Sequence, residues 1–189
     1  MKIKARIVVS SLVPLTMMLL LGVVGHLGLR SMQQTLDAVM AKGMEHFSTV
    51  NDSRSKLLEA NVAAYRLFTM LGNFDEARIA KDSAVIMGHA DGAIQLLQKF
   101  RERSDLEEDE RKALAALEEP LTRYRKSVAQ AIDMAQSDLA TGTGMMQAAD
   151  KRFLEIDAAL SKFLDQQKSE GDEMVSAANR RVSNLIATN

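Results

Sequence analysis

Two polar side chains, Arg54 and Asn61, interrupt a run of apolar residues that recur every three or four positions. This spacing places the whole run on one face of a helix, where a buried guanidinium or amide needs a hydrogen-bonding partner. A guanidinium that faces a cleft suits a carboxylate, because its planar N–H groups donate to both oxygens. One interpretation is therefore a binding site for a small carboxylate. Its predicted members are the polar Arg54, Asn61 and Arg66 and the aromatic Tyr65, Phe68 and Phe153.

A second interpretation of the same residues needs no ligand. A polar residue in an apolar seam commonly fixes helix register or oligomeric state, and an arginine can pair with an aspartate or glutamate of its own bundle. Phenylalanines at helical spacing are typical of a core. The residues themselves leave both interpretations open.

No residues suited to catalysis or metal binding recur at a useful spacing. The chain has no cysteine, which excludes thiolate nucleophiles and cysteine-based zinc sites. Its three histidines, His26, His46 and His89, lie on separate segments without the i, i+4 pairing of a helical metal site. The acidic run over 107–110 complements a helix N-terminus and needs no metal to explain it. We predict no catalytic residue, no metal, no cofactor and no enzymatic activity.

The elements that position these residues are predicted to be helices throughout. Aromatic residues make up 4% of the chain, and it has 10 glycines and 2 prolines, so strong helix formers fill most positions. Apolar residues recur at helical spacing in four stretches, which predicts helices over about 30–71, 74–103, 105–140 and 144–187. Short connections make neighbouring helices antiparallel. The predicted fold is all-α, an up-down-up-down four-helix bundle with long first and fourth helices.

Local signals set the predicted boundaries between these helices. Gly72 is expected to end the first helix in a left-handed conformation, and Asn73 to begin the second. Ser104 and Glu107 have the spacing of a capping box for the third helix. The run over 141–144, which is Thr-Gly-Thr-Gly, is the clearest predicted break before the fourth.

A predicted transmembrane helix precedes the bundle. Residues 7–29 contain no charged side chain, and about 20 apolar residues are enough to cross a bilayer. Basic residues within 1–6 place that segment in the cytoplasm by the positive-inside rule. A cleaved signal peptide is the alternative, but the apolar run is longer than usual and no A-x-A site follows. We expect residues 30–189 to be periplasmic, and a returning transmembrane helix to begin beyond Asn189.

The charge distribution argues against a nucleic-acid partner. Four of the 24 basic residues lie within 1–30, where there is no acidic residue. The remaining chain therefore carries 20 basic residues against all 25 acidic ones. A nucleic-acid-binding surface needs an excess of lysine and arginine to neutralise phosphates.

Taken together, the layout resembles the ligand-binding region of methyl-accepting chemotaxis proteins. The segments LLEANVAAYRLFTM over 57–70 and DKRFLEIDAALSKFL over 150–164 are similar to the first-helix and fourth-helix segments of that family's sensor domain. The resemblance implies a receptor in the bacterial inner membrane that forms a homodimer through the first helix. It also implies a small carboxylate ligand and a signal passed by displacement of the fourth helix.

The resemblance also bears on the ligand and on alternative functions. Asn61 and Arg66 have the five-residue spacing of two arginine positions used by the aspartate and serine receptors, so an asparagine replaces the first arginine. The ligand can therefore be an amino acid, an organic acid or an aromatic acid. A second hypothesis is that this module belongs to a sensor histidine kinase or a cyclic-dinucleotide enzyme. A ligandless, membrane-anchored structural coiled coil is the alternative outside signalling.

Overall fold

The computed structural model describes residues 26, 30 and 40–187. The chain divides into two compact units, Met1–Gly43 and Met44–Asn189, and the bundle belongs to the second. The transmembrane helix predicted over 7–29 lies outside the described residues except for His26, which is helical and exposed. Within the described part of the chain, no helix has the length and apolar character needed to cross a membrane.

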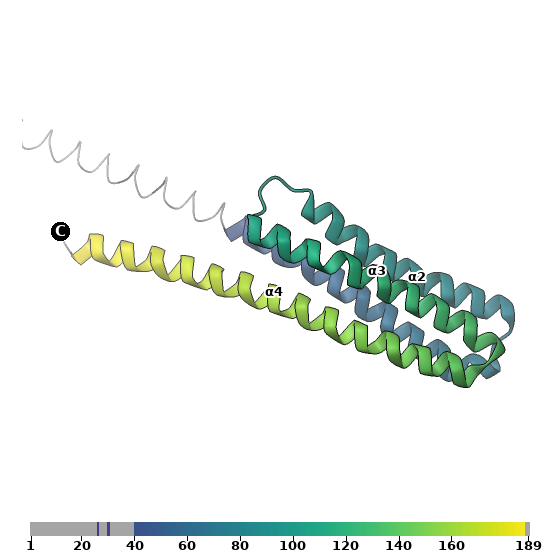
Figure 1. Ribbon diagram of the computed structural model, residues 1–189. Helices are drawn as coiled ribbons and strands as arrows, with labels where there is room; N and C mark the ends of the chain where they lie inside the picture. The colour runs from purple at the N-terminus through teal and green to yellow at the C-terminus, as the bar shows by residue number, and fades with distance from the viewer. Residues whose placement is uncertain (1–25, 27–29, 31–39, 188–189) are drawn as a thin grey trace, which may run out of the picture. The chain divides into compact units, whose positions relative to one another are not determined.

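Four helices form the described structure. The first covers residues 40–70 and is followed by a short 3-10 turn, η1 (Leu71–Asn73). The others are α2 (Glu76–Arg101), α3 (Glu108–Ser137) and α4 (Leu139–Ala187). No strand occurs among the residues described, so the predicted all-α four-helix bundle is confirmed. With 49 residues, α4 packs along α3 and its C-terminal part extends well past one end of α2 and α3 (Figure 1).

The bundle is held together by one apolar core that receives residues from every helix. Leu57, Ile86, Leu121 and Leu160 are each 0–1% exposed and come from the four successive helices. Burying one such side chain contributes roughly 1.5–3 kcal/mol to stability. The spacing that predicted the helices therefore also identified the faces that pack together.

The end of the first helix differs from the prediction. No glycine among the described residues has a positive φ, so Gly72 does not end the helix in a left-handed conformation. Instead η1 tightens the last turn, and the N–H of Phe74 donates to the carbonyl of Leu71 at 3.2 Å. Asp75, rather than Asn73, caps α2, because its carboxylate accepts from the N–H of Arg78 at 2.8 Å.

The start of α3 also differs from the prediction. Glu107, rather than Ser104, is the N-cap, and it forms a capping box with Glu110. The N–H of Glu107 donates to the Glu110 carboxylate at 2.7 Å. Three acidic residues in the first turn complement the positive end of the helix dipole, so this later start is favoured.

The break predicted at the Thr-Gly-Thr-Gly run lies inside α4. The chain turns instead at Asp138, whose backbone is extended. Its carboxylate accepts from the N–H of Thr141 at 3.1 Å and from the Thr141 hydroxyl at 2.6 Å. This cap satisfies the first donors of α4 and starts the helix five residues earlier than predicted.

Candidate ligand-binding face

The predicted site residue Asn61 lies at the junction of three helices. It is only 6% exposed. Its amide donates to Asp150 of α4 at 2.9 Å, and its carbonyl oxygen accepts from the Tyr124 hydroxyl of α3 at 3.1 Å. The partners that a buried amide requires are thus supplied by the protein itself.

Two tyrosines surround the Asp150 carboxylate. Tyr124 is fully buried, and this burial, with the nearby charge of Asp150, raises the pKa of its hydroxyl. Tyr65 is 40% exposed, and partial burial followed by its hydrogen bond to Asp150 raises the pKa of Tyr65. Both hydroxyls therefore stay neutral at physiological pH and act as hydrogen-bond donors.

Arg54 forms a two-pronged ion pair with Asp157 of α4. Its Nε donates to one carboxylate oxygen at 2.6 Å and its Nη2 to the other at 3.0 Å. The hydrogen bond to Asp157 is the main reason that the pKa of Arg54 is raised. The two side chains are 37% and 26% exposed, so solvent weakens the pair. Arg54 thus has the partner inside the bundle that the ligand-free interpretation anticipates.

The other predicted site residues lie at different depths. Arg66 is exposed, and it makes no ion pair with any residue in the described part of the chain. Phe68 is half-buried against the core. Phe153 is 6% exposed, with its ring centroid 6.1 Å from that of Tyr124. Asn61 and Tyr65 therefore meet at Asp150, and Phe153 lies behind them, whereas Arg54 belongs to a separate contact.

Sequence reasoning missed the residues that pair with the predicted site, Asp150, Tyr124 and Asp157. A signal for the two aspartates was present, because they are seven residues apart on α4, as Arg54 and Asn61 are on the first helix. Seven residues are two helical turns, so antiparallel helices bring both pairs into contact at once. No comparable spacing identified Tyr124.

Apolar side chains with exposed surface lie along one face of the first helix. Phe47, Leu58 and Val62 of the first helix are 39–59% exposed, and their spacing with Tyr65 places all four on one stripe. Leu154 of α4 is 56% exposed and lies one turn from both Asp150 and Asp157. We call the stripe formed by Phe47, Leu58, Val62 and Tyr65 the first-helix stripe.

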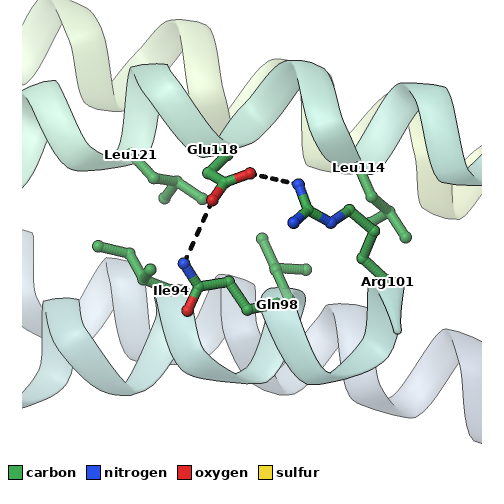
Figure 2. A pocket seen from close by; sticks show the side chains of 7 residues that line it. Ile94, Gln98, Arg101, Leu114, Glu118 and Leu121 are labelled. Carbon is green, nitrogen blue, oxygen red and sulfur yellow. Dashed lines mark hydrogen bonds and ion pairs between the residues drawn. The ribbon is translucent and has the colours of Figure 1, made fainter. Parts of the chain in front are cut away.

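Two hollows lie elsewhere in the described bundle. The hollow between α2 and α3 encloses about 10 Å³, which is space for one water molecule at most. Figure 2 shows why it is closed, since Glu118 accepts hydrogen bonds from both Arg101 and Gln98 across it. A wider groove of about 390 Å³ lies between α3 and α4, where Ala113, Ala116 and Ala159 leave space.

The described residues contain no cluster of histidine, aspartate and glutamate side chains arranged to hold a metal ion. His46 lies beside Asp105 of the α2–α3 connection and Glu110 of α3, and His89 lies beside Glu59 of the first helix.

A family model described as a four helix bundle sensory module for signal transduction matches residues 1–182. No curated protein and no solved structure matched the chain.

Proposed function

Because the chain belongs to the family of four-helix-bundle sensory modules for signal transduction, we propose that it is the extracytoplasmic sensor domain of a bacterial chemoreceptor. The proposal rests on the length of chain that the family model matches, because residues 1–182 include both the apolar stretch over 7–29 and nearly the whole bundle. In this proposal residues 7–29 anchor the chain in the inner membrane and the bundle lies in the periplasm. The protein senses and does not catalyse.

The proposed ligand is a small molecule that carries a carboxylate. Arg54 and Asn61 are already paired with Asp157 and Asp150, so of the three predicted polar site residues Arg66 is the one left to bind the carboxylate. The Tyr65 hydroxyl, one residue earlier, already donates to Asp150, so the proposed ligand contact is the Arg66 guanidinium. A carboxylate at Arg66 would gain charge-assisted hydrogen bonds without breaking either internal pair.

Ligand binding is tested by thermal unfolding of the full chain in detergent against amino acids, dicarboxylates and aromatic acids. We expect at least one carboxylate to raise the melting temperature, because a ligand that binds only the folded state stabilises it. Arg66→Ala should weaken that ligand by about tenfold or more, since it removes a charged hydrogen bond of about 1.5–3 kcal/mol. The matched control is Arg123→Ala, which removes another exposed arginine and should leave binding unchanged. The proposed site would be contradicted if no carboxylate raised the melting temperature, or if Arg66→Ala bound the ligand with the affinity of the wild type.

We propose that the first-helix stripe pairs with the same stripe of a second copy. Four large side chains with exposed apolar surface on one helical face are costly to leave in water. Parallel pairing of two such stripes is a coiled-coil-like contact that removes this surface from solvent. The homodimer would also place the two Asp150 junctions beside the contact between copies.

Disulfide cross-linking in membranes tests the homodimer, because the chain contains no cysteine of its own. Val62→Cys, at the most exposed position of the stripe, is expected to give a covalent dimer on mild oxidation. Val85→Cys is the matched control, since Val85 is also exposed but lies on α2. Equal cross-linking of both variants, or none from Val62→Cys, would exclude this interface.

A further inference from the structure

The groove between α3 and α4 is a cavity that the proposed ligand site does not use. It encloses about 390 Å³, within the range of roughly 300–1,000 Å³ that is usual for small-molecule sites. Its floor is formed by core side chains that are 1–7% exposed, Leu117, Ile156 and Phe163. Its walls include exposed alanines of both helices, Ala113, Ala116 and Ala159. The groove is thus mainly apolar and open to solvent.

Two opposite charges on α4 lie along this groove. Glu155 and Lys162 share one stripe of the helix, and the seven residues between them correspond to a rise of about 10 Å. Both side chains are exposed, and neither forms an ion pair with any residue in the described part of the chain. Gln166, which also lines the groove, already donates to Glu170 at 3.0 Å. An anion and a cation are therefore the polar side chains left for a ligand.

Pro120 leaves a backbone acceptor on the opposite side of the groove. α3 continues through Pro120, which has no N–H to donate to the carbonyl oxygen of Ala116 four residues earlier. Both residues line the groove. The hydrogen bond between Gln167 and Glu110, at 2.7 Å, sets the register of these antiparallel helices, so Ala116 and Pro120 lie opposite the α4 stretch that separates the two charges. The groove thus presents a carbonyl acceptor between its anionic and cationic ends.

We propose that this groove binds a short apolar peptide with free termini, about three residues long. An extended chain covers about 3.3–3.6 Å per residue, so three residues span about 10 Å. The terminal ammonium pairs with Glu155 and the terminal carboxylate pairs with Lys162, each through charge-assisted hydrogen bonds. A peptide N–H between them donates to the Ala116 carbonyl, and apolar side chains cover the floor. This input goes beyond carboxylate binding and does not depend on Arg66.

The spacing of the charges distinguishes a peptide from simpler ligands. A single amino acid carries its ammonium and its carboxylate on one carbon, so it cannot reach both charges of the groove. A fatty acid would pair with Lys162 but would leave Glu155 beside an apolar tail, where a carboxylate is costly to desolvate. A linear molecule with opposite charges about 10 Å apart engages both ends at once.

Isothermal titration calorimetry of the full chain in lipid nanodiscs tests the proposal, with the peptide Ala-Leu-Ala as the probe. Nanodiscs replace detergent, because detergent tails compete for an apolar groove. We expect saturable binding that weakens by about tenfold or more when the amino terminus is acetylated, and likewise when the carboxyl terminus is amidated, since each change removes one charged contact. Equal binding of the free and blocked peptides, or no binding of Ala-Leu-Ala at millimolar concentration, would overturn the proposal.

Two substitutions test whether the peptide occupies this groove. Ala159→Leu fills the groove from an exposed position and is expected to weaken binding by about tenfold or more. Ala148→Leu is its matched control, because Ala148 is an exposed alanine of α4 outside the groove, and it should bind as wild type. Arg66→Ala should also bind as wild type. Weaker binding in Arg66→Ala with unchanged binding in Ala159→Leu would locate the peptide at the candidate ligand-binding face and refute the proposal.

Lys162→Gln separates loss of a charge contact from loss of folding. It should weaken Ala-Leu-Ala by about tenfold or more but leave the amidated peptide unchanged, because that peptide has no carboxylate to pair with Lys162. Lys168→Gln, at an exposed lysine of α4 outside the groove, should change neither peptide. If Lys162→Gln weakened both peptides equally, the proposed carboxylate contact would be wrong.

Discussion

Replacing Asn61 with alanine is expected to lower the free energy of unfolding by about 2–3 kcal/mol. The substitution removes the acceptor of the fully buried Tyr124 hydroxyl and a donor to Asp150 in one step. The hydroxyl has no route to solvent, so it bears the full cost of an unpaired buried group, whereas the half-buried Asp150 can turn to water. Urea denaturation of the full chain in detergent, followed by circular dichroism, measures the difference.

Asn51→Ala is the matched control for this prediction, because Asn51 is an exposed asparagine on the same helix. Its effect should stay within about 0.5 kcal/mol, as for most surface substitutions. Tyr124→Phe in the Asn61→Ala background should recover part of the loss, since it removes the stranded hydroxyl. If Asn61→Ala costs no more than Asn51→Ala, the three-helix junction does not stabilise the bundle.

The predicted and observed structures agree where helical spacing decides the outcome. The recurrence of apolar residues predicted four helices and placed Leu57 and Asn61 on the inward face, where both are buried. It also supported the resemblance to chemoreceptor sensor modules, which the family match confirms. Spacing works here because each helix must bury one continuous stripe, and a stripe is visible in a single sequence.

The predictions fail where several local signals compete. Glycines over 141–144 predicted a break, but the Asp138 cap lies nearby and starts α4 earlier. Likewise, Glu107 and not Ser104 is the N-cap of α3, because three acidic residues follow Glu107 in the first turn. The strength of a cap depends on which neighbour its side chain reaches, and one sequence does not rank two adjacent candidates.

Which side chains meet at the candidate site depends on the register between the first helix and α4. Arg54 and Asn61 were singled out correctly as polar residues of the seam, but their partners come from α4, about 90–100 residues later in the chain. Which residues of antiparallel helices meet is set by packing of the whole core. The prediction therefore left open whether a ligand or the protein satisfies these groups, and the structure supplies Asp157 and Asp150.

These contacts join the first helix to α4 at three heights along the bundle. Asn61 pairs with Asp150, Arg54 pairs with Asp157 two turns along, and His46 reaches Gln167 through Glu110. All three include a side-chain hydrogen bond to an aspartate or glutamate carboxylate. Any movement of α4 past the first helix must therefore change all three contacts.

Gly142→Ala is expected to destabilise the bundle by about 1–3 kcal/mol, whereas Gly144→Ala should stabilise it by about 0.5–1 kcal/mol. A Cβ at the buried Gly142 would lie 2.5–2.6 Å from atoms of Ala135 on α3, two of which belong to the backbone and cannot rotate away. A Cβ at Gly144 meets nothing within 4 Å, so alanine only improves helix propensity. Each variant is the control for the other in urea denaturation of the full chain in detergent. Changes of the same sign in both would mean that close approach of α3 and α4 does not explain the glycine at 142.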